Sequence, residues 1–65
     1  MNLNLKMEIL KKFPSQADFA DKVKSREPIV SRVIRNRQKL SAKSQARWAK
    51  ALGCSVEDIF GDAAD

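Results

Sequence analysis

Histidine and tyrosine are absent from this 65-residue chain, and cysteine occurs once. A single thiol cannot form an internal disulfide, and a chain without histidine lacks the usual ligand set for zinc. Nucleophilic catalysis by Cys54 would need a neighbouring base, and no histidine can supply one, so we expect Cys54 to be a buried filler. These absences predict no catalytic residues, no metal and no cofactor. They leave helix packing or dimerisation to stabilise a domain this small.

Long apolar runs are also missing. No stretch approaches the roughly 18 apolar residues of a membrane span, and no apolar signal-peptide segment follows the N-terminal Met-Asn-Leu-Asn. The apolar share of 43% and the charged share of 32% are typical of an ordinary folded domain. We therefore expect a soluble, cytoplasmic protein without a membrane or small-molecule ligand. It should have one domain over residues 1–61 and a disordered acidic tail over residues 62–65.

Positive charge is concentrated in the middle of the chain. The net charge is +5, and residues 24–50 hold nine Lys or Arg but only one acid, Glu27. Residues 51–65 hold no Lys or Arg; their charged side chains are Glu57, Asp58, Asp62 and Asp65. Cationic charge concentrated in this way is typical of a surface that binds a polyanion. The alternative is a solvated basic helix surface.

Apolar spacing and helix-end signals predict five short helices and no strand core. We expect them over about residues 5–13, 16–23, 27–36, 42–52 and 55–60. The inward faces of the first two are predicted to carry Leu5, Ile9, Leu10, Phe13, Phe19, Ala20 and Val23. Before the first helix, Leu3 and Leu5 alternate with asparagines, a pattern compatible with a short strand or with a frayed chain end.

Serine residues precede several of the expected helices. Ser15 with Asp18, and Ser55 with Asp58, repeat the Ser-x-x-Asp capping arrangement. In this arrangement the serine hydroxyl accepts a hydrogen bond from the backbone amide of the aspartate. The aspartate carboxylate in turn accepts a hydrogen bond from the backbone amide of the serine. Gly53 stands where the fourth helix needs a left-handed residue at its end. Because these aspartates have capping roles, no spare carboxylate pair remains for acid-base chemistry.

The segment SREPIVSRVIRNRQK, residues 25–39, places a proline near the front of a basic helix. Proline disfavours the helical conformation for the residue before it, and its fixed φ suits the first helical turn. Pro28 therefore predicts the start of the third helix, near Glu27. Counting 100° per residue, the inward positions are Val30, Val33 and Ile34, and the outward positions are Pro28, Arg32 and Arg35. Arginine is preferred where bidentate contacts to guanine edges or phosphates matter.

Only Lys24, Ser25 and Arg26 separate the second expected helix from the third. Two short helices joined by a turn of three to four residues, the second of them basic and outward-facing, form the helix-turn-helix arrangement. In that arrangement the second helix enters the major groove of DNA. The sequence therefore predicts a helix-turn-helix unit over residues 16–36.

The chain resembles the Cro and phage-repressor (XRE-type) helix-turn-helix family over about residues 5–60. The family pattern is Gln-x-x-x-Ala, a turn, a hydrophobic residue followed by Ser, and later Ala-x-Ala-Leu-Gly-hydrophobic-Ser. Three segments of this chain resemble that pattern, namely Gln16 to Ala20, Val30-Ser31 and Ala49 to Ser55. The resemblance implies an all-α, compact five-helix lambda-repressor-like fold. It also implies a homodimeric repressor of phage or prophage origin, associated with the bacterial nucleoid, that binds a palindromic operator in double-stranded DNA.

The resemblance also implies which residues contact DNA. The positions that face bases are Arg26, Glu27, Pro28, Ser31 and Arg32. The positions that contact the DNA backbone are Ser15, Gln16, Arg35, Asn36, Arg37, Gln38 and Lys39. Dimer contacts are expected from the apolar residues Val56, Ile59 and Phe60, since their apolar surface exceeds what so short a helix must bury alone.

Five positions depart from the family pattern, and two of them, Glu27 and Pro28, carry residues that are unusual at base-reading positions. Lys24 and Asn36 replace glycines, so Lys24 must adopt a left-handed conformation unless the turn differs, and Asn36 is the best non-glycine residue for that conformation. Ile34 replaces a glutamate, so we expect an apolar contact with Ile9. An alternative function is a protein-interaction module, such as an antitoxin or phage accessory factor, that uses the same scaffold on a protein partner. The arginine stripe in a nearly acid-free segment favours DNA.

Overall fold

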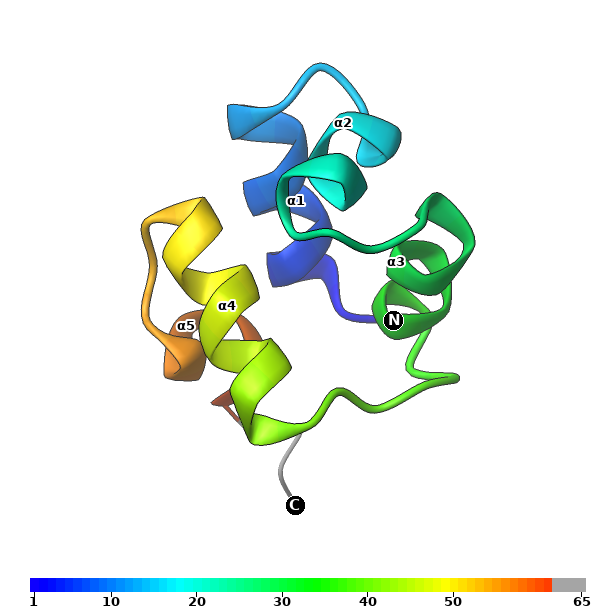
Figure 1. Cartoon of the computed structure of the whole chain (residues 1–65). Helices are drawn as coiled ribbons and strands as arrows, with labels where there is room; N and C mark the ends of the chain where they lie inside the picture. Colours follow the sequence, from blue (N-terminus) through cyan, green and yellow to red (C-terminus); the bar gives the residue numbers. More distant parts are fainter. Residues whose placement is uncertain (62–65) are drawn as a thin grey trace.

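A computed structural model describes residues 1–61 (Figure 1). These residues form five α-helices, α1 Leu3–Lys12, α2 Gln16–Lys22, α3 Glu27–Ile34, α4 Ala42–Leu52 and α5 Val56–Phe60. No strand occurs among them, so the predicted all-α class with five helices is confirmed. The expected acidic tail, residues 62–65, lies outside the described residues. No described helix is long and apolar enough to cross a membrane.

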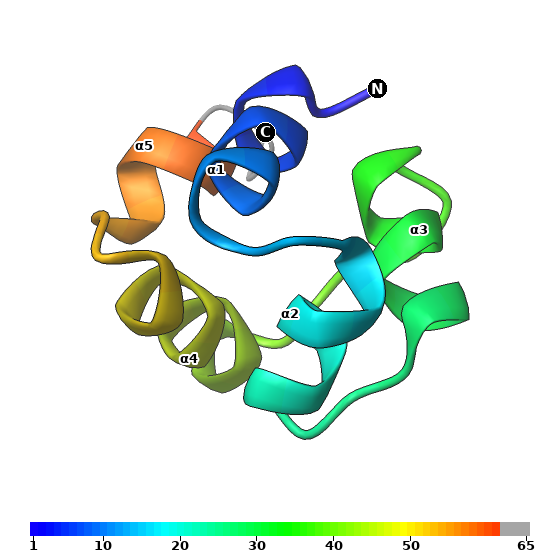
Figure 2. The ribbon, with the colours of Figure 1, turned by 90° about the horizontal axis from the view of Figure 1, so that it is seen from above.

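Helix α1 contacts all four other helices, while α2 packs on α3 and α4 packs on α5 (Figure 2). Thirteen apolar side chains form one buried cluster to which every helix contributes. The cluster contains the predicted inward residues Phe19, Ala20 and Val23, and it contains both Ile9 and Ile34. A single core therefore holds α2 and α3 against the other described helices.

Aromatic side chains run through this core as a connected series. The ring of Phe19 is fully buried and lies edge-on to Phe13, at a centroid distance of 5.3 Å, and to Trp48, at 5.2 Å. Trp48 continues the series to Phe60, whose centroid is 6.4 Å away. Edge-to-face pairs add stabilisation beyond the area they bury. These rings tie α2, α4 and α5 to the residue that follows α1.

The start of α1 differs from the expected strand or frayed end, because Asn2 anchors it. The Asn2 side-chain oxygen accepts from the Leu5 amide at 3.0 Å and so caps the helix. The Asn2 backbone amide donates to the Ile34 carbonyl at 2.6 Å, and its side-chain amide donates to the Ile59 carbonyl at 2.6 Å. One residue thus joins the first turn of α1 to the last residue of α3 and to α5.

The inward face of α1 was also predicted too broadly. Leu5 and Ile9 are fully buried, but Leu10 is 54% exposed, so its predicted place in the core is wrong. The reason is angular, because Leu10 lies about 140° around the helix from Leu5. Helix α1 therefore carries apolar side chains on two opposite sides.

Three helices end in the same way, with a left-handed residue followed by a hydrogen bond back to the last turn. The left-handed residues are Lys24, Asn36 and Gly53, with φ of 58°, 61° and 70°. The bonds join Ser25 N to Ala20 O at 2.8 Å, Arg37 N to Arg32 O at 2.9 Å, and Cys54 N to Ala49 O at 3.0 Å. This is the Schellman motif. It confirms the left-handed conformation expected of Lys24 and Asn36, and it ends α3 at Ile34 rather than Asn36.

Lys24→Gly is expected to stabilise the domain by about 0.5 to 1 kcal/mol, because glycine adopts the left-handed conformation without the clash of a Cβ atom. Thermal unfolding followed by circular dichroism should show a melting temperature raised by about 2 to 8 °C. Asn36→Gly is the matched control and should gain less, since asparagine tolerates this conformation well. An unchanged or lowered melting temperature for Lys24→Gly would contradict the strained turn.

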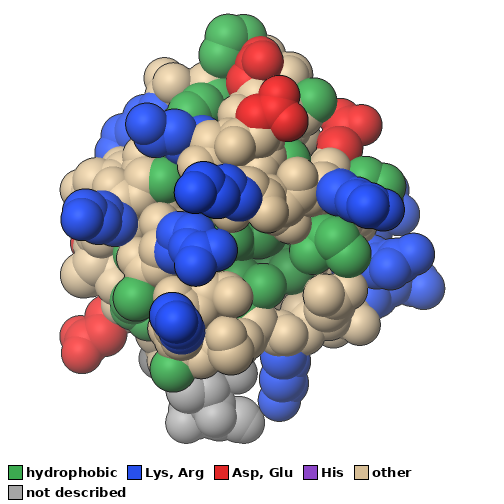
Figure 3. Space-filling model, viewed as in Figure 1, with side chains coloured by type: hydrophobic (Ala, Val, Ile, Leu, Met, Phe, Trp, Pro, Cys, Tyr) green, Lys and Arg blue, Asp and Glu red, His purple; other side chains and the backbone are tan. Residues whose placement is uncertain are grey.

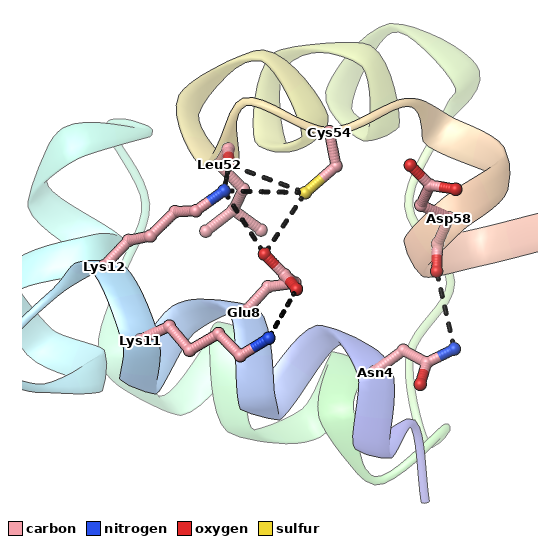
Figure 4. Close-up of polar contacts among 7 residues, drawn as sticks. All are labelled: Asn4, Glu8, Lys11, Lys12, Leu52, Cys54 and Asp58. Atoms are coloured by element: carbon pink, nitrogen blue, oxygen red, sulfur yellow. Dashed lines mark hydrogen bonds and ion pairs between the residues drawn. The ribbon is translucent and has the colours of Figure 1, made fainter.

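A polar cluster joins α1 to the end of α4 (Figure 4). The Lys12 ammonium donates to the Leu52 carbonyl, where a cation is favoured by the helix dipole. Glu8 lies 3.2 Å from the Lys12 ammonium and 3.5 Å from that of Lys11. The hydrogen bond from Lys12 lowers the pKa of the Glu8 carboxyl below its usual value. The cluster secures the contact between these helices.

Cys54 lies beside this cluster and is half-buried, which differs from the buried filler that we expected. Its thiol donates to Glu8 at 3.5 Å. Burial raises the pKa of the Cys54 thiol, and the hydrogen bond to Glu8 raises it further. The thiol therefore stays protonated at neutral pH. A nearby capping box matches the prediction in full, with Ser55 and Asp58 each accepting from the other's backbone amide.

Candidate nucleic-acid interface

The unit α2–turn–α3 positions the residues expected to contact DNA. At its start, Ser15 accepts from the Asp18 amide at 3.2 Å, as predicted. The Asp18 carboxylate accepts a hydrogen bond from the Ser15 hydroxyl at 3.0 Å rather than from the Ser15 backbone amide, so this capping box is only half formed. Helix α2 ends at Lys22, and residues 23–26 form the turn that leads into α3.

Helix α3 begins where proline predicts. Arg26 is the N-cap, with extended φ of −128° and ψ of 149°, Glu27 is the first helical residue and Pro28 the second. Glu27 was expected near the N-cap and lies one position inside the helix, in the first turn, where a carboxylate is favoured by the helix dipole. No side chain caps this end. The start of α3 is therefore set by backbone geometry, which leaves the side chains of Arg26 and Glu27 exposed.

The two faces of α3 lie as its spacing predicts. Val30, Val33 and Ile34 are buried, at 0%, 5% and 3% exposed. Pro28, Arg32 and Arg35 are exposed, and Ser31 beside them is half-buried. The helix thus uses its apolar side to hold its place and directs its arginines to solvent.

The cations of residues 24–50 have no partner among the described residues. Within the described part of the chain, the ion pairs are those of Glu8 with Lys11 and Lys12. None of the nine Lys and Arg side chains in residues 24–50 forms an ion pair or a hydrogen bond with a described group. An external anion could therefore bind them without breaking an existing pair. Glu27 is the one carboxylate in this segment.

One hollow of about 160 Å³ lies between α1, α2 and α3. It brings together Gln16 from α2, Ser31 from α3 and Arg35, the C-cap of α3, which are three of the predicted DNA contacts. Lys6 of α1 lines the same hollow, and sequence reasoning assigned it no role. Its positive charge was the only available signal, because it is ten residues before Gln16 and belongs to a helix outside the basic segment.

A second hollow, of about 320 Å³, lies beside the loop between α3 and α4. Asn36, Gln38 and Lys39 line it, opposite Asn2 and Phe60. The loop is held to α4 by the side chain of Gln45, which donates to the Leu40 carbonyl at 3.3 Å. Five of the predicted backbone contacts therefore line one or the other of these two hollows. Arg37 is exposed in the loop, and Ser15 is the N-cap of α2.

Helix α4 adds a further set of cations, which belong to the basic segment but were not predicted to contact DNA. Lys43, Arg47 and Lys50 are exposed and recur at spacings of four and three residues, which places them on one side of the helix. Figure 3 shows Lys and Arg side chains distributed across the face seen in Figure 1, including the part over α4, with Asp and Glu at its edges. The helical spacing of Lys43, Arg47 and Lys50 is the sequence signal that could have predicted this basic surface.

The predicted dimer residues lie differently from expectation. Ile59 and Phe60 are 3% and 6% exposed, and Val56 is half-buried against the same core. The spare apolar surface expected on α5 is absent, because its contacts with α1 and α4 cover these side chains within one chain.

Comparison with protein-family models finds no matching family, and comparisons with curated proteins and with solved structures find no significant match.

Proposed function

We propose that this chain is a sequence-specific regulator of transcription that binds double-stranded DNA through α3. The observation that carries the proposal is the α2–turn–α3 unit, whose second helix buries its apolar side and presents arginines that pair with no group in residues 1–61. Such a helix has the width and charge to enter the major groove, where base edges can be distinguished. The five-helix order supports the narrower proposal of a Cro or lambda-repressor-like fold.

In this proposal the residues of α3 read bases. Arg32 is exposed at the middle of the outward side, where a guanidinium can bind guanine O6 and N7 together. Arg26, Glu27 and Ser31 lie around it, and the ring of Pro28 suits contact with a thymine methyl. Direct readout would therefore come from the first two turns of α3.

Phosphate contacts would flank the recognition helix. Gln16 and Arg35 meet at the hollow that Lys6 also lines, while Asn36 and Lys39 lie at the other hollow. Contacts to phosphate fix the register and orientation of a protein on the duplex without reading its sequence. Ser15, Arg37 and Gln38 complete this set. Repression would follow from competition with polymerase for promoter DNA.

The proposal includes binding as a homodimer to a palindromic operator. Two identical chains related by a two-fold axis place two recognition helices in successive major grooves, about 34 to 36 Å apart. Selection of bound sites from random duplexes tests this directly. Inverted half-sites with centres about one helical turn apart are expected.

Binding should also depend strongly on salt. The four cations that flank the recognition helix are Lys6, Arg35, Arg37 and Lys39, which give about four phosphate contacts per chain and about eight per dimer. The logarithm of the association constant of the dimer should therefore fall with the logarithm of salt concentration, with a slope of about −7. Fluorescence anisotropy with a labelled duplex over a salt series measures the slope. Weak retention on DNA cellulose even at low salt would argue against DNA. It would favour the alternative of a protein-interaction module, such as an antitoxin or a phage accessory factor.

A further inference from the structure

Exposed apolar side chains gather on one helix. The large apolar residues exposed in the described part of the chain are Met1, Leu3, Met7 and Leu10, at 65%, 58%, 54% and 54%. Three of them belong to α1 and recur at spacings of four and three residues, so they share one side of the helix. We refer to Leu3, Met7 and Leu10 as the α1 stripe.

The fold of one chain does not explain the α1 stripe. Helix α1 already buries Leu5 and Ile9 completely on its other side. Charged residues at the stripe positions would be solvated at less cost than these apolar side chains. Clustered exposed apolar residues are typical of an interaction surface rather than of an ordinary solvent-facing helix.

We propose that the α1 stripe is the surface through which two copies of this chain associate, with their α1 helices antiparallel about a two-fold axis at Met7. A contact between identical chains must be self-complementary, because the same residues face each other in reverse order. The stripe meets this condition, since one leucine lies four residues before Met7 and the other lies three residues after it. Antiparallel pairing sets Leu3 against Leu10 of the second copy and Met7 near its own counterpart.

The spacing of the α1 stripe and the charges beside it fit a second copy of this chain. Alternating steps of four and three residues are those of a helix-pairing seam. Lys6 and Lys11 flank the stripe, and Glu8 lies 3.5 Å from the Lys11 ammonium, which reduces the repulsion between two copies. The aliphatic parts of lysine side chains can cover apolar surface while their charges stay in water. A membrane surface would also suit lysines beside an apolar stripe, but it would not require a symmetric spacing.

The size of the surface predicts a weak dimer. A helix of ten residues is about 15 Å long. Two such helices would bury on the order of 1,000 Å² in total, the lower limit of a specific interface. The inference rests on the proposed function for its role on DNA, since it supplies the dimer surface that α5 does not expose. The association itself is tested with the protein alone.

Sedimentation of the full chain over about 1 µM to about 1 mM should show a mass that rises from 7.3 kDa toward twice that value. Met7→Glu and Met7→Lys should each raise the dissociation constant at least about 100-fold, because like charges would meet at the two-fold axis. An equimolar mixture of the two variants should associate again, because opposite charges would then meet. Met7 is exposed, so both variants should keep the helical circular dichroism of the original chain.

Ala46→Glu, at an exposed position of α4, is the matched control and should associate like the original chain. The proposal is overturned if the original chain stays monomeric throughout, if Met7→Glu associates as tightly, or if the mixture fails to associate. Binding to anionic phospholipid vesicles without self-association would assign the stripe to a membrane instead. A monomeric chain that still binds half-site duplexes would overturn the dimer surface and leave DNA binding intact.

Discussion

Phe19→Ala is expected to lower the free energy of unfolding by about 3 to 5 kcal/mol. Phe19 is fully buried, and its ring lies edge-on to both Phe13 and Trp48. Alanine would remove both contacts and leave a cavity between α2 and α4. Surrounding side chains could fill it only in part, because the neighbouring rings are themselves held by α5 and by the end of α1.

The consequence should be loss of the folded state, because a domain of this size gains only about 3 to 5 kcal/mol from its core. Urea titration followed by far-ultraviolet circular dichroism measures the change. Phe13→Ala is the comparison variant, and its cost should be smaller, since Phe13 is half-buried at one end of the series. A urea midpoint for Phe19→Ala close to that of the original chain would contradict the central role of this ring.

Arg32→Ala should weaken binding to the selected operator by about 1 to 3 kcal/mol, a loss of roughly 5- to 150-fold, and relax the base preference at one position of each half-site. The expected cause is loss of a bidentate contact to a guanine edge. Anisotropy titration with the selected duplex and with single-base variants measures both effects. Arg32 is exposed, so the stability of the domain should change by less than about 0.5 kcal/mol.

Lys39→Ala provides the matched control for a phosphate contact. It should weaken binding to all duplexes alike and reduce the magnitude of the salt slope by about one for each chain of the bound dimer. Equal binding of the selected operator by Arg32→Ala and by the original chain would disprove the base-reading role of Arg32. A loss that is the same for every duplex would place Arg32 among the phosphate contacts instead.

Local signals predicted most of the helices. The bounds of α4 follow from Ser41 and Gly53, whose roles depend only on the adjacent backbone. The side chains of α3 face as its periodicity predicts, because Val30, Val33 and Ile34 recur with the helical period and are buried. The end of α3 was placed two residues late, because the left-handed Asn36 closes the helix before it.

Features that depend on distant packing could not be predicted in this way. The cap of α1 requires Asn2 to meet the Ile34 and Ile59 carbonyls, which no local pattern reveals. The same limit applies to Lys6 and to the burial of Phe60, since both depend on how α1 and α5 lie against other helices. Leu10 shows the complementary error, in which an apolar residue was assumed to face the core.

Asn2 gives the domain an unusual mechanical property. Its contact with Ile59 spans 57 positions of the chain, and its contact with Ile34 reaches the end of the proposed recognition helix. A chain terminus is ordinarily the first part of a domain to open. Here, unwinding the first turn of α1 would also break the hydrogen bonds that Asn2 makes to α5 and to the carboxyl end of α3. Asn2 therefore couples the opening of α1, α3 and α5, so local unfolding of one of these helices should be accompanied by unfolding of the others.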